Sequence, residues 1–466
     1  MTTPLWWEGS DSAPAASGPS PYASRYPSPG LPGPSVPSTA DVVIVGGGFT
    51  GLWTAHYLTV ADPSLDIVVL EAEHVGFGAS GRNGGWVSAL WPVGPEALAR
   101  RSGRPAALAM LSALRETVVE VGRAAEQLGV DCGFRQGGVV ALARSSAQEA
   151  RARAEVAHSD EWAMGTQWLG PAQASARLAA SELRGATFNP HCARIHPRRL
   201  VDGLAASVRA RGVQVVEGAT VCRIEPASVV LQDGHRVRAR HIIRATEAWT
   251  SRLPGLRREV APVYSLMVAT EPLTEQEWST IGLADGEVFT DHRHVVIYGQ
   301  RTVDNRLAFG GRGAPYHFGS QIRPEFDHEA TVFADLRSTL TGILPQLDRV
   351  RFTHAWGGPL GIARDWHPSV GYDAATGLGW AGGYVGDGVA ATNLAGRTLA
   401  DLVTRRHTAL TELPWVGHHS RRWEPEPLRW FGVNAGLRLA HAADLEEART
   451  GHPARLGRAL AALTGH

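Results

Sequence analysis

The glycine run that follows a short apolar segment is the strongest chemical signal in this sequence. Residues 41–45 begin with Asp41 and continue with four apolar, β-branched residues, as in a buried parallel strand, and a helical pattern begins at Leu52. Between them Gly46, Gly48 and Gly51 have the spacing GxGxxG. This spacing permits a tight turn, close approach of the backbone to a pyrophosphate, and close packing of the helix on the strand. It therefore predicts a dinucleotide site at the start of the helix.

An acidic residue reduces the number of candidate dinucleotides. The next predicted strand, 67–70, ends at Glu71, about 20 residues beyond the glycines, as in dinucleotide-binding folds. A carboxylate at this place accepts hydrogen bonds from the ribose hydroxyls of adenosine and disfavours the extra phosphate of NADP. NAD and FAD both remain compatible with these residues.

Two further glycine-rich segments favour FAD over NAD. Residues 78–85 form a loop that could run along the ribityl phosphate and the flavin edge. Residues 382–388 precede a helix, and the partial positive charge at a helix start suits the negative charge of a reduced flavin. Arg82 and Asn83 are predicted cofactor contacts, whereas Asp387 is either a helix cap or a flavin contact.

The elements around these motifs alternate between strand and helix at both ends of the chain and turn mainly to strands in the middle. Helical patterns cover much of 95–129 and 145–180, and strands dominate 258–315. This order predicts a mixed α/β fold, in which an antiparallel substrate domain is inserted into a Rossmann-like FAD-binding domain. We assign 41–135, 190–257 and 350–405 to the FAD-binding domain, 136–189 and 258–349 to the substrate domain, 1–40 to a Pro/Ser-rich arm and 406–466 to a C-terminal extension.

The amino-terminal arm has a composition unlike that of a packed domain. It holds nine of the 29 prolines, so it cannot bury enough apolar surface to fold alone. Trp6 and Trp7 either anchor the arm on the folded body or belong to a disordered leader.

Composition excludes several classes of function. The 45 acidic and 45 basic residues balance, so no general attraction to nucleic acid or to an anionic membrane is expected. The sequence has no lysine, which excludes pyridoxal-phosphate and P-loop chemistry. Three cysteines without a CxxC spacing indicate neither a disulfide framework nor a metal site. Because we find no transmembrane or signal-peptide pattern, we expect a cytoplasmic protein.

The chain resembles the FAD-dependent D-amino-acid oxidase superfamily, in particular its glycine-oxidase, sarcosine-oxidase and γ-glutamylputrescine-oxidase-like branch. The motifs that carry the resemblance are VGGGFTGL at 45–52, GASGRNGG at 78–85, RIHP at 194–197, ATEAW at 245–249, PVY at 262–264, FGGRG at 309–313, YH at 316–317, WGG at 356–358, PSVG at 368–371 and GYVGDG at 383–388. The resemblance implies FAD, a small amine or amino acid as substrate, hydride transfer to flavin N5, an imine product and dioxygen as the usual acceptor. Relatives that attach the flavin covalently use a cysteine or a histidine, and because no cysteine lies near Leu360 and no histidine lies in the loop 78–85, we expect noncovalent FAD.

Two departures from the family pattern concern the substrate and the acceptor. Relatives that oxidise glycine or D-amino acids carry an arginine for the substrate carboxylate in the position of Leu360, and an apolar side chain cannot make that pair. An amine without an α-carboxylate is therefore favoured, with a D-amino acid or an N-methyl amino acid as the alternative. Sarcosine-oxidase relatives use a lysine above the flavin, and Arg312 is the nearest replacement cation here.

The candidate site combines these contributions. Arg312 is either a cation that faces the substrate or flavin, or half of a salt bridge, and His196 is expected to cap a helix. Aromatic and histidine candidates could line the pocket or pack in the core. The predicted catalytic residues are Arg312, Tyr316, His317, Tyr264 and Trp356. The predicted cofactor contacts are Gly46, Gly48, Phe49, Thr50, Gly51, Glu71, Ala79, Ser80, Arg82, Asn83, Gly84, Gly85, Ala245, Thr246, Trp249, Gly383, Tyr384, Gly386, Asp387, Gly388 and Val389.

Two other functions stay open. The pair Gly386 and Asp387 superficially matches the Gly-Asp pair of flavin monooxygenases, although residues 245–249 end their strand in the manner of amine oxidases. The arm and the arginine-rich tail 405–466 would suit a noncatalytic FAD-binding protein that docks on a partner.

Overall fold

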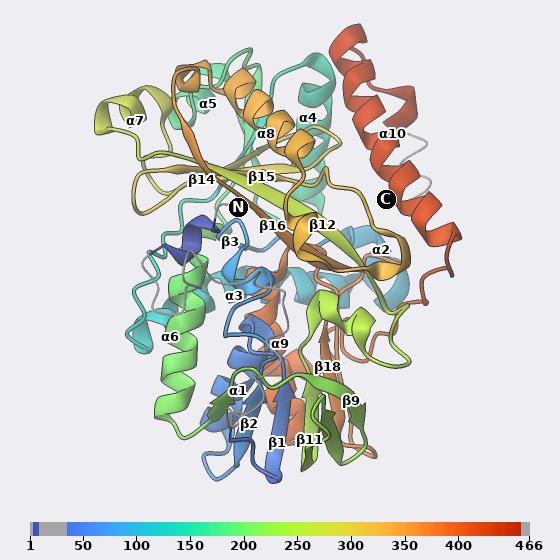
Figure 1. The fold of residues 1–466 in the computed structure, drawn as a ribbon. Helices are drawn as coiled ribbons and strands as arrows, with labels where there is room; N and C mark the ends of the chain where they lie inside the picture. Colours follow the sequence, from blue (N-terminus) through green and yellow to red (C-terminus); the bar gives the residue numbers. More distant parts are fainter. Residues whose placement is uncertain (1–2, 9–34, 458–466) are drawn as a thin grey trace.

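Two eight-stranded sheets organise the computed structural model, which describes residues 3–8 and 35–457 (Figure 1). The lower sheet in Figure 1 has the order β17-β18-β11-β1-β2-β8, and β18, β11, β1, β2 and β8 run parallel. Its strands are β1 (Thr39–Val45), β2 (Ile67–Leu70), β8 (Gln214–Val216), β9 (Val221–Glu225), β10 (Ser228–Leu231), β11 (Arg236–Arg244), β17 (Ser369–Asp373) and β18 (Leu378–Gly382). A parallel sheet of this kind matches the predicted Rossmann-like domain.

The central strand β1 is buried on both faces because its apolar residues alternate between two clusters. Val42 and Ile44 pack with the helices, and Val43 packs with β9 to β11 on the other face. Helix α1 follows β1 and packs on α9, where a Cβ on Gly396 would lie 2.7 Å from the carbonyl carbon of Trp53. The helices of this domain are α1 (Phe49–Ala61), α2 (Pro95–Ser102), α3 (Arg104–Gln127), α6 (Pro197–Ala210) and α9 (Gly388–Val403).

The upper sheet is mainly antiparallel and has the order β16-β12-β15-β14-β13-β4-β6-β5. Helix α8 packs against β12 and β15 (Figure 1). The strands are β4 (Val139–Ala143), β5 (Gln167–Leu169), β6 (Gly185–Asn189), β12 (Val260–Thr270), β13 (Val288–Asp291), β14 (Ile297–Arg301), β15 (Leu307–Gly311) and β16 (Phe352–Ala363). The helices are α4 (Ser146–Glu161), α5 (Pro171–Arg177), α7 (Glu275–Ile281) and α8 (Ala330–Ile343).

Shorter elements connect these layers. The strands β3 (Trp86–Ser88) and β7 (Cys192–Arg194) form a two-stranded sheet. The 3-10 helices are η1 (Leu5–Trp7), η2 (Ala79–Gly81), η3 (Glu247–Arg252), η4 (Phe318–Ser320), η5 (Pro324–Asp327), η6 (Pro345–Leu347) and η7 (Ala409–Glu412).

One segment that we assigned to the FAD-binding domain belongs to the upper sheet. β16 lies within the predicted segment 350–405, yet it pairs antiparallel with β12 along its whole length. The glycine-rich sequence of this strand is compatible with either sheet, and only its pairing with β12 shows that it belongs to the upper one. β16 therefore brings residues of the upper sheet to the boundary between the two domains.

The first residues of the arm are anchored on the folded body. Trp6 and Trp7 are only 1% and 2% exposed. The indole of Trp6 donates to the carbonyl oxygen of Asn83 at 2.8 Å, and that of Trp7 donates to Gly81 at 3.0 Å. The anchoring interpretation is confirmed for these two tryptophans, while residues 9–34 of the arm lie outside the described residues.

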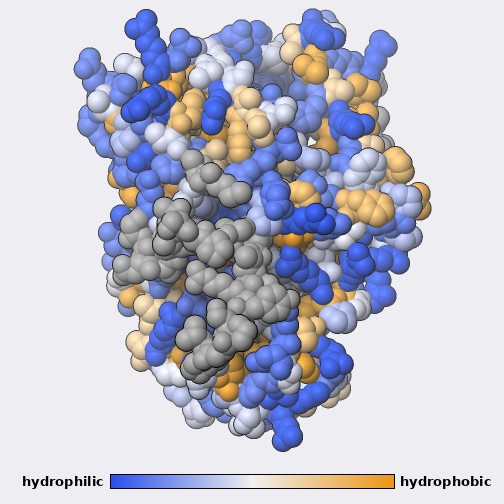
Figure 2. Space-filling model, viewed as in Figure 1, coloured by the Kyte–Doolittle hydropathy of each residue, from blue (hydrophilic) through white to orange (hydrophobic). Residues whose placement is uncertain are grey.

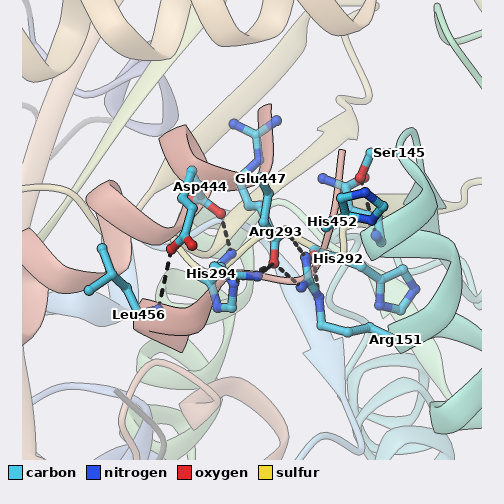
Figure 3. A network of polar contacts seen from close by, with 12 residues as sticks. Ser145, Arg151, His292, Arg293, His294, Asp444, Glu447, His452 and Leu456 are labelled. Carbon is cyan, nitrogen blue, oxygen red and sulfur yellow. Dashed lines mark hydrogen bonds and ion pairs between the residues drawn. The ribbon is translucent and has the colours of Figure 1, made fainter. Parts of the chain in front are cut away.

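The extension contains a helix that the sequence pattern did not predict. α10 (Leu428–Thr450) has no continuous apolar face, which removes the periodic signal of a packed helix. It docks on the upper domain through acidic side chains (Figure 3). Glu447 accepts two hydrogen bonds of 2.6 Å from Arg151 and one of 3.0 Å from His294. Asp444 accepts the backbone N–H groups of His294 and Val295.

None of the helices in the described residues has the length and apolar character of a membrane span. The face shown in Figure 2 carries mostly hydrophilic residues with apolar ones scattered among them.

Replacing Glu447 with glutamine should weaken the docking of α10. Burial alone would raise the pKa of Glu447, but the hydrogen bonds from Arg151, Ala454 and His294 lower it to about 2. The carboxylate therefore stabilises the fold above its ordinary pKa of 4.5, and this contribution is lost as the pH falls toward about 2. We expect Glu447→Gln to lower the free energy of unfolding by about 2 kcal/mol near neutral pH, measured by urea denaturation.

The matched control is Glu126→Gln, because Glu126 is exposed on α3. Its stability should equal that of the unmodified protein. The difference between Glu447→Gln and the unmodified protein should shrink in acid. A difference that stays constant down to the acid limit would contradict this account of α10 docking.

Candidate active site

A cavity of about 450 Å³ opens where the parallel strands of the lower sheet end. We call it the dinucleotide cavity. Its walls come from the turns after β1, β2 and β11, from the loop around η2, and from the start of α9. The carboxyl ends of parallel strands are the usual ligand position in open α/β sheets.

The turn from β1 to α1 requires glycine at the predicted positions. Gly46 has a φ of +115°, which L side chains rarely adopt. A Cβ on Gly51 would lie 2.0 Å from the carbonyl oxygen of Gly46, and one on Gly48 would lie 2.8 Å from Ser80 Oγ. The backbone is therefore open to a closely approaching ligand at this turn.

Glu71 lies at the edge of the dinucleotide cavity as expected. Its Oε2 accepts the N–H of Gly47 at 2.7 Å, and its Oε1 accepts the N–H of Glu73 at 3.0 Å. Burial raises the pKa of this carboxyl group, while these backbone N–H groups oppose the rise. Each carboxylate oxygen keeps a free lone pair that can accept a ribose hydroxyl, so the acid fits an adenosine ribose.

The sequence prediction missed a second acid in this wall, Glu247. Its Oε2 accepts the N–H of Gly361 in β16 at 2.6 Å, and its Oε1 accepts the N–H of Tyr384 at 3.2 Å. Burial raises the pKa of Glu247 to about 7, against the effect of these N–H groups. Its φ of +42° is a left-handed conformation for a non-glycine residue. The acid at the centre of the motif at 245–249 was the available signal.

A second cavity of about 140 Å³, the inter-sheet cavity, adjoins the first. It lies between the start of α9 and the strands β12 to β14 of the upper sheet, with Ser265, Met267 and Tyr298 in its wall. The residues that line both cavities are Ala79, Asn83, Leu360, Gly386 and Val389. A ligand in the dinucleotide cavity can therefore extend to the upper sheet at this junction.

Opposite charges meet in the inter-sheet cavity. The carboxylate of Asp387, directly before α9, has neither a hydrogen bond nor an ion pair to the described part of the chain, and it does not cap the helix. Burial raises its pKa to about 6, and the nearby guanidinium of Arg312 opposes the rise. Arg312 donates to the carbonyl oxygen of Val385 and forms no salt bridge with a described residue. The salt-bridge alternative for Arg312 thus finds no support.

Four predicted catalytic residues line neither cavity, and two of them lie toward α10. The hydroxyl of Tyr316 donates to Glu426 at 2.7 Å. The imidazole of His317 stacks on Phe326 with ring centroids 3.3 Å apart. The chain turns away from the cavity after Arg312, so the end of this segment serves packing.

The other two, Tyr264 and Trp356, are buried in packing contacts. Ser265 and Met267 of β12 face the inter-sheet cavity, so Tyr264, the residue before Ser265, points to the opposite face of the sheet. The indole of Trp356 donates to the carbonyl oxygen of Arg82 at 2.9 Å. Core packing, the alternative for both residues, is what the structure shows.

Arg82 lines the inter-sheet cavity, but its guanidinium hydrogen-bonds to other groups of the protein. It forms a buried ion pair of 2.6 Å with Asp327 and donates to the carbonyl oxygens of Phe77 and Gly357. It also lies over the ring of Trp7. Arg82 therefore ties the arm and the loop 78–85 to the upper domain.

The remaining predictions concern the helix cap His196 and the cofactor contacts, most of which line the dinucleotide cavity. His196 caps α6, since its Nδ1 accepts the N–H of Arg199 at 3.3 Å. The predicted cofactor contacts that line the dinucleotide cavity are Gly46, Gly48, Phe49, Thr50, Glu71, Ala79, Ser80, Asn83, Ala245, Thr246, Trp249, Tyr384, Gly386, Gly388 and Val389. Arg82, Gly84 and Asp387 line the inter-sheet cavity, and Gly51, Gly85 and Gly383 line neither.

The parallel sheet and the glycine turn define a Rossmann-type, dinucleotide-binding protein. Residues 41–402 match the family model described as FAD dependent oxidoreductase (DAO), and the chain belongs to this family. The cofactor is FAD, as the sequence predicted, and the protein is an FAD-dependent oxidoreductase.

Individual relatives agree with this assignment. γ-Glutamylputrescine oxidoreductase of Escherichia coli is 31% identical over 385 residues, which are 81% of this chain and 87% of that protein. The probable oxidoreductase OrdL of Haemophilus influenzae is 27% identical over 381 residues, 78% of this chain and 83% of that protein. The crystal structure of glycine oxidase from Geobacillus kaustophilus shares the fold with a TM-score of 0.67 at 23% identity, over 82% of this chain and 100% of that one.

Replacing Glu71 with glutamine should weaken FAD binding. The amide keeps the shape of the carboxyl group but loses the charge that strengthens a hydrogen bond from ribose. We expect the dissociation constant of FAD to rise about tenfold, measured by titrating FAD into apoprotein while its fluorescence is followed. Glu126→Gln is again the control, and an unchanged constant for Glu71→Gln would contradict the assigned contact.

Proposed function

We propose that this protein oxidises the carbon–nitrogen bond of a small amine that carries no α-carboxylate, with dioxygen as the final electron acceptor. The observation that carries the proposal is that the inter-sheet cavity is lined by both an apolar side chain, Leu360, and a carboxylate without a partner in the described residues, Asp387. One side chain offers nothing to a carboxylate, and the other offers a carboxylate to an ammonium group.

Leu360 makes the junction between the two cavities apolar. It lies in β16 opposite Val263 of β12 and lines both cavities. An α-carboxylate placed against its isobutyl group would lose water without gaining a partner, and such burial costs several kcal/mol. An apolar substrate carbon loses nothing there.

Asp387 supplies the complementary group. Its carboxylate lines the inter-sheet cavity without a hydrogen-bonding partner in the described residues. It can hold the ammonium form of an amine and accept one of its protons. Loss of this proton frees the lone pair of the substrate nitrogen, which the loss of hydride from the adjacent carbon requires.

FAD, when bound, supplies the hydride acceptor. The chain contributes the walls that orient the substrate beside it. Tyr298 and Ser265 form a hydroxyl pair at 2.8 Å, and Met267 adds an apolar surface. Val296, 41% exposed, lies in the rim of the cavity next to the backbone that α10 holds. The docked extension thus fixes one edge of the cavity.

A second candidate, oxidation of a D-amino acid or an N-methyl amino acid, is favoured by Arg312. Its guanidinium lines the same cavity and has no carboxylate partner among the described residues. A guanidinium can bind a substrate carboxylate in a bidentate manner. Relatives of the chain include proteins named glycine oxidase and γ-glutamylputrescine oxidoreductase, so its family contains oxidoreductases of amino acids and of longer amines.

Anaerobic flavin reduction by a panel of polyamines, N-methyl amines and D-amino acids separates the two candidates. We expect amines without an α-carboxylate to reduce the flavin faster, because Leu360 cannot bind a carboxylate. The matched variant Leu360→Arg should shift the preference toward D-amino acids. Oxygen consumption by the reduced protein tests the acceptor separately.

Equal or faster reduction by free D-amino acids would overturn the proposal in favour of the second candidate. Absence of reduction by every compound in the panel would overturn both and indicate a noncatalytic FAD-binding protein.

A further inference from the structure

A third cavity of about 250 Å³ lies close to the dinucleotide cavity but does not belong to it. We call it the Arg244 cavity, after the last residue of β11. Its other walls come from β18, from residues 367–369 and from residues 418–420 of the C-terminal extension. Like the dinucleotide cavity, it lies at the carboxyl end of a parallel strand, where α/β sheets bind ligands.

The guanidinium of Arg244 has no hydrogen bond or ion pair to any described residue, although it is largely enclosed. Burial lowers its pKa, and Glu259 only partly opposes this. The buried arginines in the described chain are each paired with an acid, namely Arg82 with Asp327, Arg198 with Asp202 and Arg429 with Glu426. Arg244 lacks such a partner among the described residues, and its side chain lines the open volume of the cavity.

The groups around Arg244 leave its charge uncompensated and add hydrogen-bond donors. Glu259, the acid in the lining, lies 3.5 Å from Arg422 and so shares its charge with another arginine. Ser369 contributes a hydroxyl group to the wall, and because its oxygen accepts the indole N–H of Trp380, its proton is free to be donated. The hydroxyl of Ser420, also in the wall, is already engaged by His418 and Asp365. A guanidinium beside hydroxyl groups is the donor set that suits phosphate or carboxylate oxygens.

A direct path of contacts joins the Arg244 cavity to the FAD site. The helix η3 contributes Thr250 to the Arg244 cavity and Trp249 to the dinucleotide cavity. Thr250 Oγ1 lies 2.8 Å from Oγ1 of Thr246, which lines the dinucleotide cavity. The two cavities thus share a wall, while their ligand-facing groups are different.

We propose that the Arg244 cavity binds a small oxyanion, a phosphate or carboxylate group of a metabolite, through the guanidinium of Arg244. The planar fork of the guanidinium donates two parallel N–H groups to two oxygens of one anion. The hydroxyl of Ser369 adds a further donor. This site is separate from the amine site and does not depend on which amine the protein oxidises.

Isothermal titration of the FAD-loaded protein with inorganic phosphate, and separately with succinate, tests the proposal in a zwitterionic buffer of low chloride. We expect saturable binding of at least one of the two anions. The stronger of the two identifies the ligand group as a phosphate or a carboxylate. Arg244→Gln should weaken this binding at least about tenfold, because it removes the charged fork.

The matched control is Arg240→Gln, because Arg240 is exposed on the same strand. It should bind the anion as the unmodified protein does. Arg244→Lys keeps the charge without the fork and should bind with intermediate affinity, which preserves the test if Arg244→Gln fails to hold FAD. Absence of saturable binding up to about 10 mM, or equal binding by the Arg244 and Arg240 variants, would overturn the proposal.

Discussion

The buried carboxylate of Glu247 connects the parts of the chain that form the FAD site. It holds Gly361 of β16 and Tyr384 of the loop before α9, so one side chain fixes the upper sheet relative to the lower domain. Burying a carboxylate is costly unless hydrogen bonds satisfy it. Those bonds come from backbone N–H groups of two separate segments, which makes the approach of β16 to α9 a condition for stability. Leu360 and Asp387 are placed by this approach.

A second buried charge, that of Arg82, also joins the two domains. The ion pair of Arg82 with Asp327 joins the loop 78–85 to the upper domain, and Trp7 of the arm lies under the guanidinium. With α10 held by Glu447, both ends of the described chain thus pack around the catalytic unit. The arm and the extension therefore act as supports of the site.

Local chemistry in the sequence was enough to predict the FAD turn, since the glycine spacing and Glu71 all lie within one strand–helix–strand unit of the sequence. Arg82 was beyond such reasoning, because its partner Asp327 is 245 residues away along the chain. The orientation of Tyr264 depends on which face of β12 meets the lower domain, and this is a property of sheet packing. α10 escaped prediction because polar contacts hold it, so its sequence lacks an apolar stripe.

The central claim is that the carboxylate of Asp387 receives the amine. The pH dependence of kcat/KM tests it most directly. Burial raises the pKa of Asp387 to about 6, and because the ionised form must bind the ammonium group, kcat/KM should rise with pH through about 6. Asp387→Asn should hold FAD normally but lack this rise, whereas Asp387→Glu should keep one. An Asp387→Asn variant that retains the same rise at the same pH would contradict the account.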